Sequence, residues 1–113
     1  MEVVDLRVKY LRPKYDNYSE WLYADDRHIY IGRAINRPHL YCLKSKWYNP
    51  FTMRQCKTRQ EICEKYEEYI RKSELYDQLE ELDGKILGCW CVGEHNECHG
   101  LILIKLLNEK KNK

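Results

Sequence analysis

The sequence lacks several features that mark large classes of proteins. Its longest aliphatic run, 101–104, is far too short to span a bilayer, so we expect no membrane partner. The amino terminus has no basic-then-apolar pattern, so we expect no secretion signal. No Walker loop, GxGxxG, HExxH or nucleophile elbow is present. One phenylalanine stands against ten tyrosines and three tryptophans, so nearly all the aromatic side chains carry a polar tip suited to half-buried positions and contact surfaces.

The remaining composition is typical of one small globular domain. A chain of 113 residues, 43% hydrophobic and 34% charged, buries about two-thirds of its unfolded surface when it folds. The formal net charge of +2 does not by itself indicate a polyanionic partner. Six cysteines would allow three disulfides in a secreted protein. Without a secretion signal we expect reduced thiols and a cytoplasmic location, in the host cell or in a virion if the source is viral.

Period-two alternation and β-forming residues predict three strands. Residues 3–10 alternate between apolar and charged side chains, and Pro13 is expected to end that strand. A loop or short helical turn is expected at 14–27, before a second strand over 28–33. Residues 34–51 show no sustained periodicity, and the third strand is expected over 85–91.

Helical spacing and capping residues predict two longer helices and a short one. Thr58 opens a capping box with Glu61, followed by an apolar stripe at three- and four-residue spacing. A short helix is expected over 75–82, and a last helix from about Cys98 to Asn108, with buried positions at Leu101, Ile104 and Leu107. Together the elements predict a small single α/β domain over 1–113, with about three strands in a mixed or parallel sheet flanked by two to three helices. Residues 109–113 form a basic tail.

Thiols and imidazoles gather between the third strand and the last helix. Thiolate and imidazole are ligand types that zinc prefers, and four such groups close a tetrahedral site. The candidate ligands are Cys89, Cys91, Cys98 and His99, with His95 as a substitute. Their spacing differs from the two-residue knuckle of common zinc motifs, and an iron–sulfur cluster fits the three cysteines less well.

The same segment permits catalysis without a metal. Cys98 is expected at the start of the last helix, where free amides and the helix dipole stabilise a thiolate. His99 or His95 would move a proton beside it, which makes Cys98 and His99 the candidate catalytic residues. A purely structural interpretation also stands, in which Cys89 and Cys91 are small buried residues at a strand end and His99 is a capping side chain.

A basic and aromatic group is the second candidate site. Gly32, at a strand end, would let a ligand approach the backbone, while Arg33 and Lys46, with Lys44, would hold phosphate. Trp47 or Tyr48 would offer a flat face for a base, and Asn49 would read a base edge or fix the turn before Pro50. The alternative is a loop with a solvated basic side, in which Trp47 fills the core.

Several short motifs, in this order, resemble one family. They are YIGR at 30–33, SKWYNPF at 45–51, TR at 58–59, GKILGCWC at 84–91 and CHG at 98–100. The family is the domain-of-unknown-function family numbered 4326, of bacteria, phages and large DNA viruses, and the resemblance covers about 28–107. Residues 1–27 then form an amino-terminal extension with a strand. Tyr48 stands where the family usually has glycine, and the insert at 34–44 is longer than the family pattern.

The resemblance implies positions and not a reaction. The positions are Gly32, Arg33, Lys46, Trp47, Asn49, Pro50, Cys89, Cys91, Cys98 and His99. Our first hypothesis is a small enzyme or enzyme-like domain that acts on or binds a nucleotide or nucleic acid, with the two candidate sites in one cleft if the three strands are parallel neighbours. The alternative is a zinc-stabilised, non-catalytic binding or virion-associated module that meets a protein or nucleic-acid partner.

Overall fold

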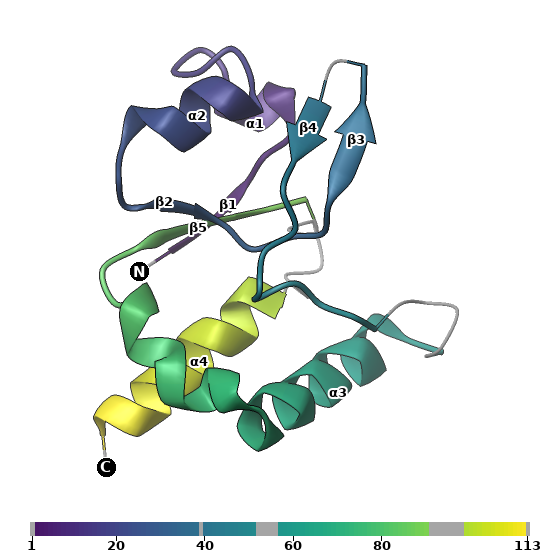
Figure 1. Cartoon of the computed structure of the whole chain (residues 1–113), viewed down its shortest axis with the longest axis vertical. Coiled ribbons are helices and arrows are strands. Elements are labelled where there is room, and N and C mark those ends of the chain that lie inside the picture. Colours follow the sequence, from purple (N-terminus) through teal and green to yellow (C-terminus); the bar gives the residue numbers. More distant parts are fainter. Residues whose placement is uncertain (1, 39, 52–56, 91–98, 113) are drawn as a thin grey trace.

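Three parallel strands form the centre of the molecule. A computed structural model describes residues 2–38, 40–51, 57–90 and 99–112. Strands β1 (Glu2–Asp5), β5 (Ile86–Cys89) and β2 (His28–Tyr30) lie in the order β1-β5-β2, with β5 in the middle (Figure 1). Ile86 is in register with both Glu2 and His28. The predicted α/β class and the parallel form of the sheet are therefore confirmed.

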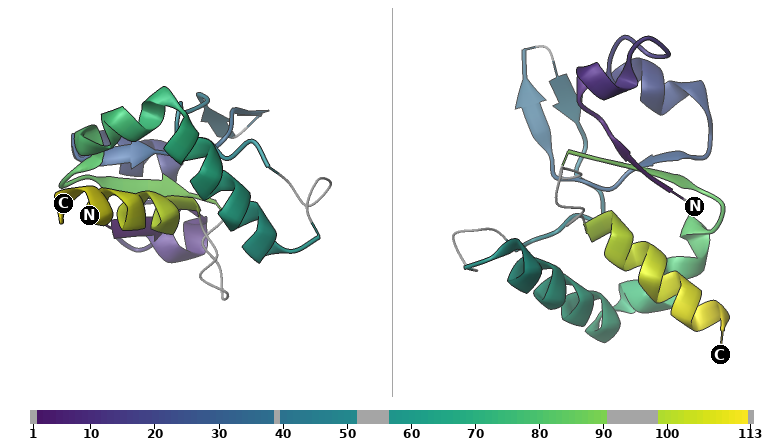
Figure 2. Two further views of the ribbon diagram at one scale, coloured as in Figure 1. Left: turned by 90° about the horizontal axis from the view of Figure 1, so that it is seen from below. Right: turned by 180° about the vertical axis from the view of Figure 1, so that it is seen from behind.

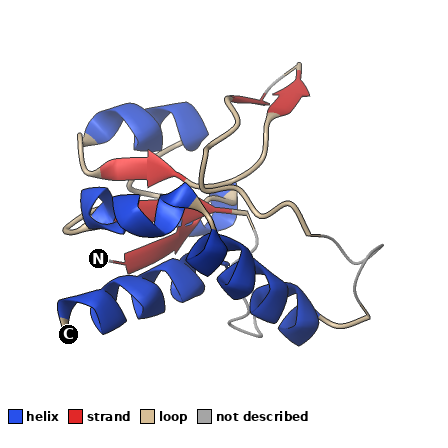
Figure 3. Cartoon of the chain, turned by 60° about the horizontal axis from the view of Figure 1, so that its bottom comes forward, coloured by secondary structure: helices blue, strands red, loops and turns tan. Residues whose placement is uncertain are grey.

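Helices cover both faces of this sheet (Figures 1 and 3). On one face lie α1 (Val8–Leu11) and α2 (Tyr18–Ala24), and on the other lie α3 (Arg59–Lys72), η1 (Glu74–Leu82) and α4 (His99–Lys111). Alternation along β5 divides the core accordingly: Leu87 and Cys89 join the buried cluster on the α4 side, while Ile86 packs with Trp21 of α2. Every described helix is too short or too polar to cross a membrane.

Gly88 allows the α2 layer to pack close to the sheet. A Cβ atom built on Gly88 would clash with the ring of Trp21, which is only 2% exposed. The N-terminal cap of α2 is Asn17, whose side chain accepts a hydrogen bond of 2.9 Å from the Glu20 amide. The segment 14–27, predicted as a loop or short helical turn, therefore contains a seven-residue helix that contacts β2 and, through Trp21, Gly88 of β5.

The first strand is shorter than predicted. The strand predicted over 3–10 was wrong beyond Asp5, because the chain there turns into α1 and does not continue as a strand toward Pro13. The Asp5 carboxylate accepts hydrogen bonds from the Arg7 amide, at 3.0 Å, and from the Arg7 guanidinium. This local side-chain turn competes with a strand, although Leu6 is fully buried as the alternation requires.

A hairpin that the sequence did not predict follows β2. Strands β3 (Ile35–Arg37) and β4 (Leu40–Cys42) pair antiparallel as a separate two-stranded sheet, which stands beside the main body (Figure 2). Three residues per strand are too few for alternation to register in the sequence. The hairpin occupies part of the 34–51 segment and forms one side of the site described below.

The helical half confirms most predicted positions. The Thr58 hydroxyl accepts from the Glu61 amide at 3.1 Å, but the Glu61 carboxylate accepts from the Lys57 amide rather than completing a standard box. The predicted short helix at 75–82 is the 3₁₀ helix η1, capped by Ser73. On α4, the buried side chains include Leu103, Leu106 and Leu107. The burial predicted for Leu101 was wrong, because its side chain is 40% exposed.

Candidate functional site

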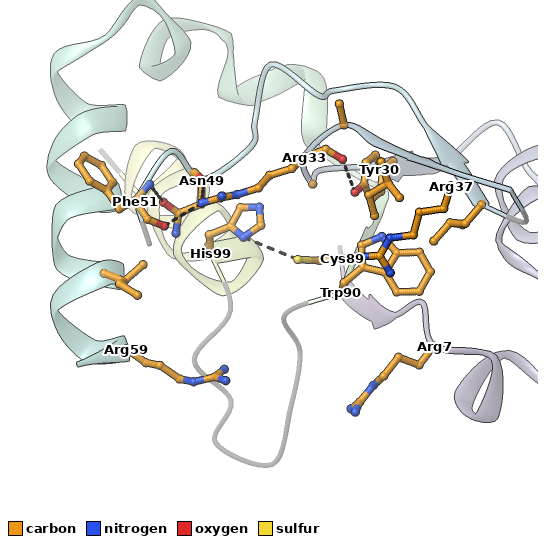
Figure 4. Close-up of a pocket in the computed structure, with 15 residues that line it drawn as sticks. Arg7, Tyr30, Arg33, Arg37, Asn49, Phe51, Arg59, Cys89, Trp90 and His99 are labelled. Atoms are coloured by element: carbon orange, nitrogen blue, oxygen red, sulfur yellow. Dashed lines mark hydrogen bonds between the residues drawn. The ribbon is translucent and has the colours of Figure 1, made fainter. Parts of the chain in front are cut away.

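A pocket lies at the carboxyl ends of the three parallel strands, where open α/β sheets bind their ligands. Its volume is about 690 Å³, and Arg7, Gly32 and Trp90, each shortly after a strand, lie in its lining. The hairpin contributes Ile35, Arg37 and Leu40, the loop before α3 contributes Asn49 and Phe51, and α3 contributes Arg59 and Ile62. Cys89 and His99 also line it (Figure 4). Of the residues predicted for the two candidate sites, the structure brings five together in the lining of this pocket: Gly32, Arg33, Asn49, Cys89 and His99.

Cys89 and His99 form a thiol–imidazole pair in this pocket. The Cys89 sulfur lies 3.7 Å from Nδ1 of His99, and Nε2 of His99 lies 2.7 Å from the carbonyl oxygen of Ile31. Because a carbonyl oxygen only accepts, Nε2 carries a proton and donates it. Nδ1 is then the nitrogen that faces the sulfur. A nucleophile, a base and a group that orients the base have this arrangement in many hydrolases and transferases.

The fold around the pair explains why it forms. Cys89 points to the α4 side because it alternates with Gly88 along β5, and His99 is the first residue of α4. Gly100 lets this first turn approach the sheet, since a Cβ atom there would come within 2.8 Å of Val3 and 2.9 Å of Ile31. Cys89 is 3% exposed and His99 is 5% exposed, so the pair lies at the base of the pocket.

Arg33 holds the loop that forms one wall. Its Nη2 donates to the carbonyl oxygens of Asn49, at 2.8 Å, and Phe51, at 3.0 Å. The Asn49 side chain accepts from the Phe51 amide at 2.9 Å and so fixes the turn. The Tyr30 hydroxyl donates to the Arg33 carbonyl at 2.6 Å, and burial raises the pKa of Tyr30, which keeps the hydroxyl protonated as a donor. Two N–H groups of Arg33 therefore hold this loop in place, and the guanidinium still carries its positive charge.

Positive charge dominates the pocket. Four of its described lining residues are arginines, Arg7, Arg33, Arg37 and Arg59, and none is an aspartate or glutamate. Arg7 is paired with Asp5 at 2.6 Å. Arg37 and Arg59 are exposed and have no ion pair within the part of the chain that the structure describes. The arrangement suits an anion, because guanidinium groups bind phosphate and carboxylate oxygens in a bidentate manner.

Two predicted phosphate- and base-binding residues lie elsewhere. Lys46 donates to Gln78 at 2.7 Å and forms an ion pair with Glu81, on the η1 side of the molecule. Trp47 is 2% exposed in the core, and its carbonyl accepts from the Tyr66 hydroxyl at 2.7 Å. Trp47 therefore has the core-filling position that the alternative interpretation gave it, and the structure does not bring it to the pocket.

Part of the predicted metal set cannot be placed. Cys91, Cys98 and His95 lie outside the described residues, so their relation to Cys89 and His99 is not part of the described geometry. Among the described residues, no three histidine, cysteine or acidic side chains converge in a way that would hold a metal ion. Cys89 and His99 are the two members of the predicted set that the structure brings together.

Sequence reasoning missed Arg7, Arg37, Arg59 and Trp90. Arg37 lies in the hairpin that short alternation did not reveal, and Arg7 follows the strand that was predicted too long. Arg59 and Trp90 did carry a signal, since Arg59 opens a capped helix and Trp90 follows the central strand. Once the order of the strands is known, Trp90 is expected at the pocket because it directly follows the carboxyl end of the central strand.

The fold and the site define a class of protein: a small α/β domain whose arginine-lined pocket lies at the carboxyl ends of a parallel sheet and contains a thiol–imidazole pair. The chain belongs to the family described as domain of unknown function DUF4326, whose model matches residues 16–109. It is 42% identical over 84 residues to an uncharacterised protein of Acanthamoeba polyphaga mimivirus. That match covers 69% of this chain and 65% of the viral protein, so the chain spans less than two-thirds of this relative. No solved structure matches the chain.

The family match confirms the resemblance and extends it. The matched span begins at residue 16, before the 28–107 segment that carries the motifs, and therefore includes α2. The viral relative agrees with the expected occurrence in large DNA viruses. The family has no described activity, so the function rests on the site.

Proposed function

We propose that the pocket binds a nucleotide or a segment of nucleic acid through its phosphate groups. The observation that supports this most directly is the set of four guanidinium groups around one hollow, with no carboxylate among the described lining residues. The place of the pocket, at the carboxyl ends of parallel strands, agrees with where α/β proteins bind phosphorylated ligands. Arg37 and Arg59 take the role that the sequence had given to Lys46.

Aromatic and aliphatic side chains in the same lining suit the base. Trp90 and Phe51 line the pocket, and Phe51 is held edge-on to Tyr69 at 6.1 Å between ring centres. Stacking of a base on an aromatic ring typically contributes about 1–3 kcal/mol to binding. These two rings replace Trp47 as the proposed base contacts.

Cys89 and His99 give the pocket a chemical function in our proposal. Cys89 is the nucleophile and His99 the base, in place of the predicted pair Cys98 and His99, because among the cysteines that the structure describes Cys89 is the one that faces Nδ1. The cytoplasm would keep the Cys89 thiol reduced, as such a role requires. The protein would then be an enzyme or enzyme-like domain that acts on the phosphorylated ligand held by the arginines.

A second candidate function has one observation in its favour. The 3.7 Å separation of sulfur and nitrogen is close to the roughly 3.6 Å expected between two such ligands of tetrahedral zinc. A zinc-bound histidine also commonly donates its second N–H to a backbone carbonyl, as His99 does to Ile31. In this case the protein is a zinc-stabilised, non-catalytic binding or virion-associated module, with Cys91 and Cys98 as further candidate ligands.

Metal analysis separates the two candidates. Protein purified without added metal would contain about one zinc per chain if the module is correct, and removal of the zinc would unfold it. If the enzyme is correct, the protein without metal stays folded. Circular dichroism before and after treatment with a chelator measures the difference.

Calorimetric titration tests the phosphate-binding function. We expect a deoxynucleoside monophosphate to bind at least about tenfold more tightly than the same nucleoside without phosphate, since each charge-assisted hydrogen bond typically contributes more than 1.4 kcal/mol. Arg59→Gln should weaken binding, while Lys65→Gln, which removes an exposed charge from the same helix outside the pocket, should not. The proposal would be overturned if nucleoside and nucleotide bound equally well. It would also be overturned if neither a nucleotide nor a short oligonucleotide bound at all.

A further inference from the structure

The four guanidinium groups of the pocket fall on two opposite walls (Figure 4). Arg59, the first residue of α3, and Arg33, beside Asn49, lie on the α3 side. Arg37, the last residue of β3, and Arg7, after β1, lie on the other side near Trp90. Cys89 and His99 lie between the two groups. A ligand whose anionic group binds the arginines of only one wall leaves the arginines of the other wall without an anion from the ligand.

On each wall one arginine is already engaged and the other is not. Arg33 holds two backbone carbonyls, and Arg7 is held by Asp5. Arg59 and Arg37 are exposed, and neither guanidinium group has a hydrogen bond or ion pair in the described part of the chain. Each of these two side chains therefore has a full guanidinium available to an anion, one on each wall.

The pocket also offers surface to an uncharged body. Besides the arginines, its lining includes Ile35, Leu40, Phe51 and Ile62, none of which can pair with a charge. A volume of about 690 Å³ lies within the range of small-molecule sites and exceeds what a single phosphate group fills. The ligand is thus expected to be charged at both ends and apolar or aromatic in the middle.

We infer that the ligand carries two anionic groups at separate positions, as in a nucleotide with phosphates on both the 5′ and the 3′ position of its sugar. Arg59 binds one phosphate, Arg37 binds the other, and the base and sugar lie between them. Adjacent phosphates, as in a nucleoside diphosphate, form one compact charge and engage one wall. The inference rests on the proposed function, which requires only that phosphate be bound.

A matched pair of ligands tests this inference. Adenosine 3′,5′-bisphosphate and adenosine 5′-diphosphate have the same base and sugar and two phosphate groups each, and differ in whether those groups are separate or adjacent. Thymidine 3′,5′-bisphosphate and thymidine 5′-diphosphate form a second pair, so that base preference does not decide the result. Calorimetry with the full chain, with Arg37→Gln and with Arg59→Gln gives the affinities, and Lys65→Gln is the control.

The expected result is about tenfold tighter binding of the bisphosphate than of the diphosphate in at least one pair, as expected for one additional charge-assisted contact. Each arginine variant should remove that advantage, with circular dichroism unchanged because both side chains are exposed. Equal affinities within both pairs, or an advantage that survives in either variant, would overturn the inference while phosphate binding stands. Failure of all four nucleotides to bind would overturn both the inference and the proposed function.

Discussion

The imidazole of His99 faces the sulfur of Cys89 across 3.7 Å, at the point where the central strand ends and the last helix begins. Its other nitrogen donates to the Ile31 carbonyl at 2.7 Å, so the orientation of the ring is fixed from the β2 side. The pocket lined by the four arginines lies at this same end of the sheet, at the carboxyl ends of its strands. The thiol–imidazole pair and the four arginines therefore line one pocket.

Replacement of His99 tests the structural part of this arrangement. His99→Ala leaves the Ile31 carbonyl without its donor and opens a cavity beside Tyr66, whose ring lies edge-on to the imidazole at 5.1 Å. We expect the free energy of unfolding to fall by about 2–4 kcal/mol. Urea denaturation measures it. Leu101→Ala, a change at an exposed position of the same helix, should cost less than about 1 kcal/mol, and equal effects of the two variants would contradict the described packing.

Alkylation tests whether Cys89 lies in the ligand site. Because Cys89 lines the pocket, a bound nucleotide should shield it, and its rate of reaction with iodoacetamide should fall by about tenfold at a ligand concentration of ten times Kd. Peptide mapping by mass spectrometry gives the rate for each cysteine. Cys63 lies on α3 outside the pocket lining and serves as the internal control. Protection of both residues, or of neither, would argue against a shared site.

Close packing at Gly88 predicts a strong response to one methyl group. Gly88→Ala would press a Cβ atom against the Trp21 ring and Leu6, both buried. We expect a loss of about 1–3 kcal/mol in stability, because a packed core must shift to admit the new atom. Thermal unfolding followed by circular dichroism measures it, and a melting temperature unchanged from the wild type would show that α2 does not lie where it is described.

The α3–α4 contact predicts a pH dependence. A hydrogen bond from Lys105 and a further one from Arg71 hold the pKa of Glu67 below its ordinary value of 4.5. Since the carboxylate is favoured in the folded state, its contribution to stability is present above pH 4.5 and is lost as pH falls through the lowered pKa. Glu67→Gln should flatten this part of the stability curve, with about 1 kcal/mol lost at neutral pH. Denaturant unfolding at a series of pH values measures both, and parallel curves for the two proteins would contradict the assignment.

The sequence predicts those elements whose physical signal is local. The Thr58 cap, the apolar stripe of α3 and the short helix after Ser73 follow from spacing and capping alone, and all three are found. The prediction of a strand over 3–10 was wrong after Asp5 because a bidentate Asp5–Arg7 contact turns the chain there. The alternation of apolar and charged residues carries no sign of such a contact. Trp47 shows the opposite limit: its motif suggested a ligand contact, yet only the tertiary fold shows that it lies in the core.

The candidate site was predicted in part for a related reason. Cys89, His99, Gly32, Arg33 and Asn49 were found because they stand in unusual local clusters. Arg37 carries no such signal among the twenty lysines and arginines, and although Arg59 opens a capped helix, only the fold brings these two residues to opposite walls of one pocket. A charge that acts through the tertiary arrangement leaves no pattern along the chain.

The salt dependence of nucleotide binding tests the central claim most directly. If the arginines of the pocket bind phosphate, the affinity of the wild-type chain for a short single-stranded oligonucleotide falls steadily as the salt concentration rises. In the double variant Arg37→Gln/Arg59→Gln the affinity should be lower at every salt concentration and the logarithmic slope smaller by about one to two units. An affinity that does not change with salt, or a slope that is the same in the double variant as in the wild type, would contradict the account.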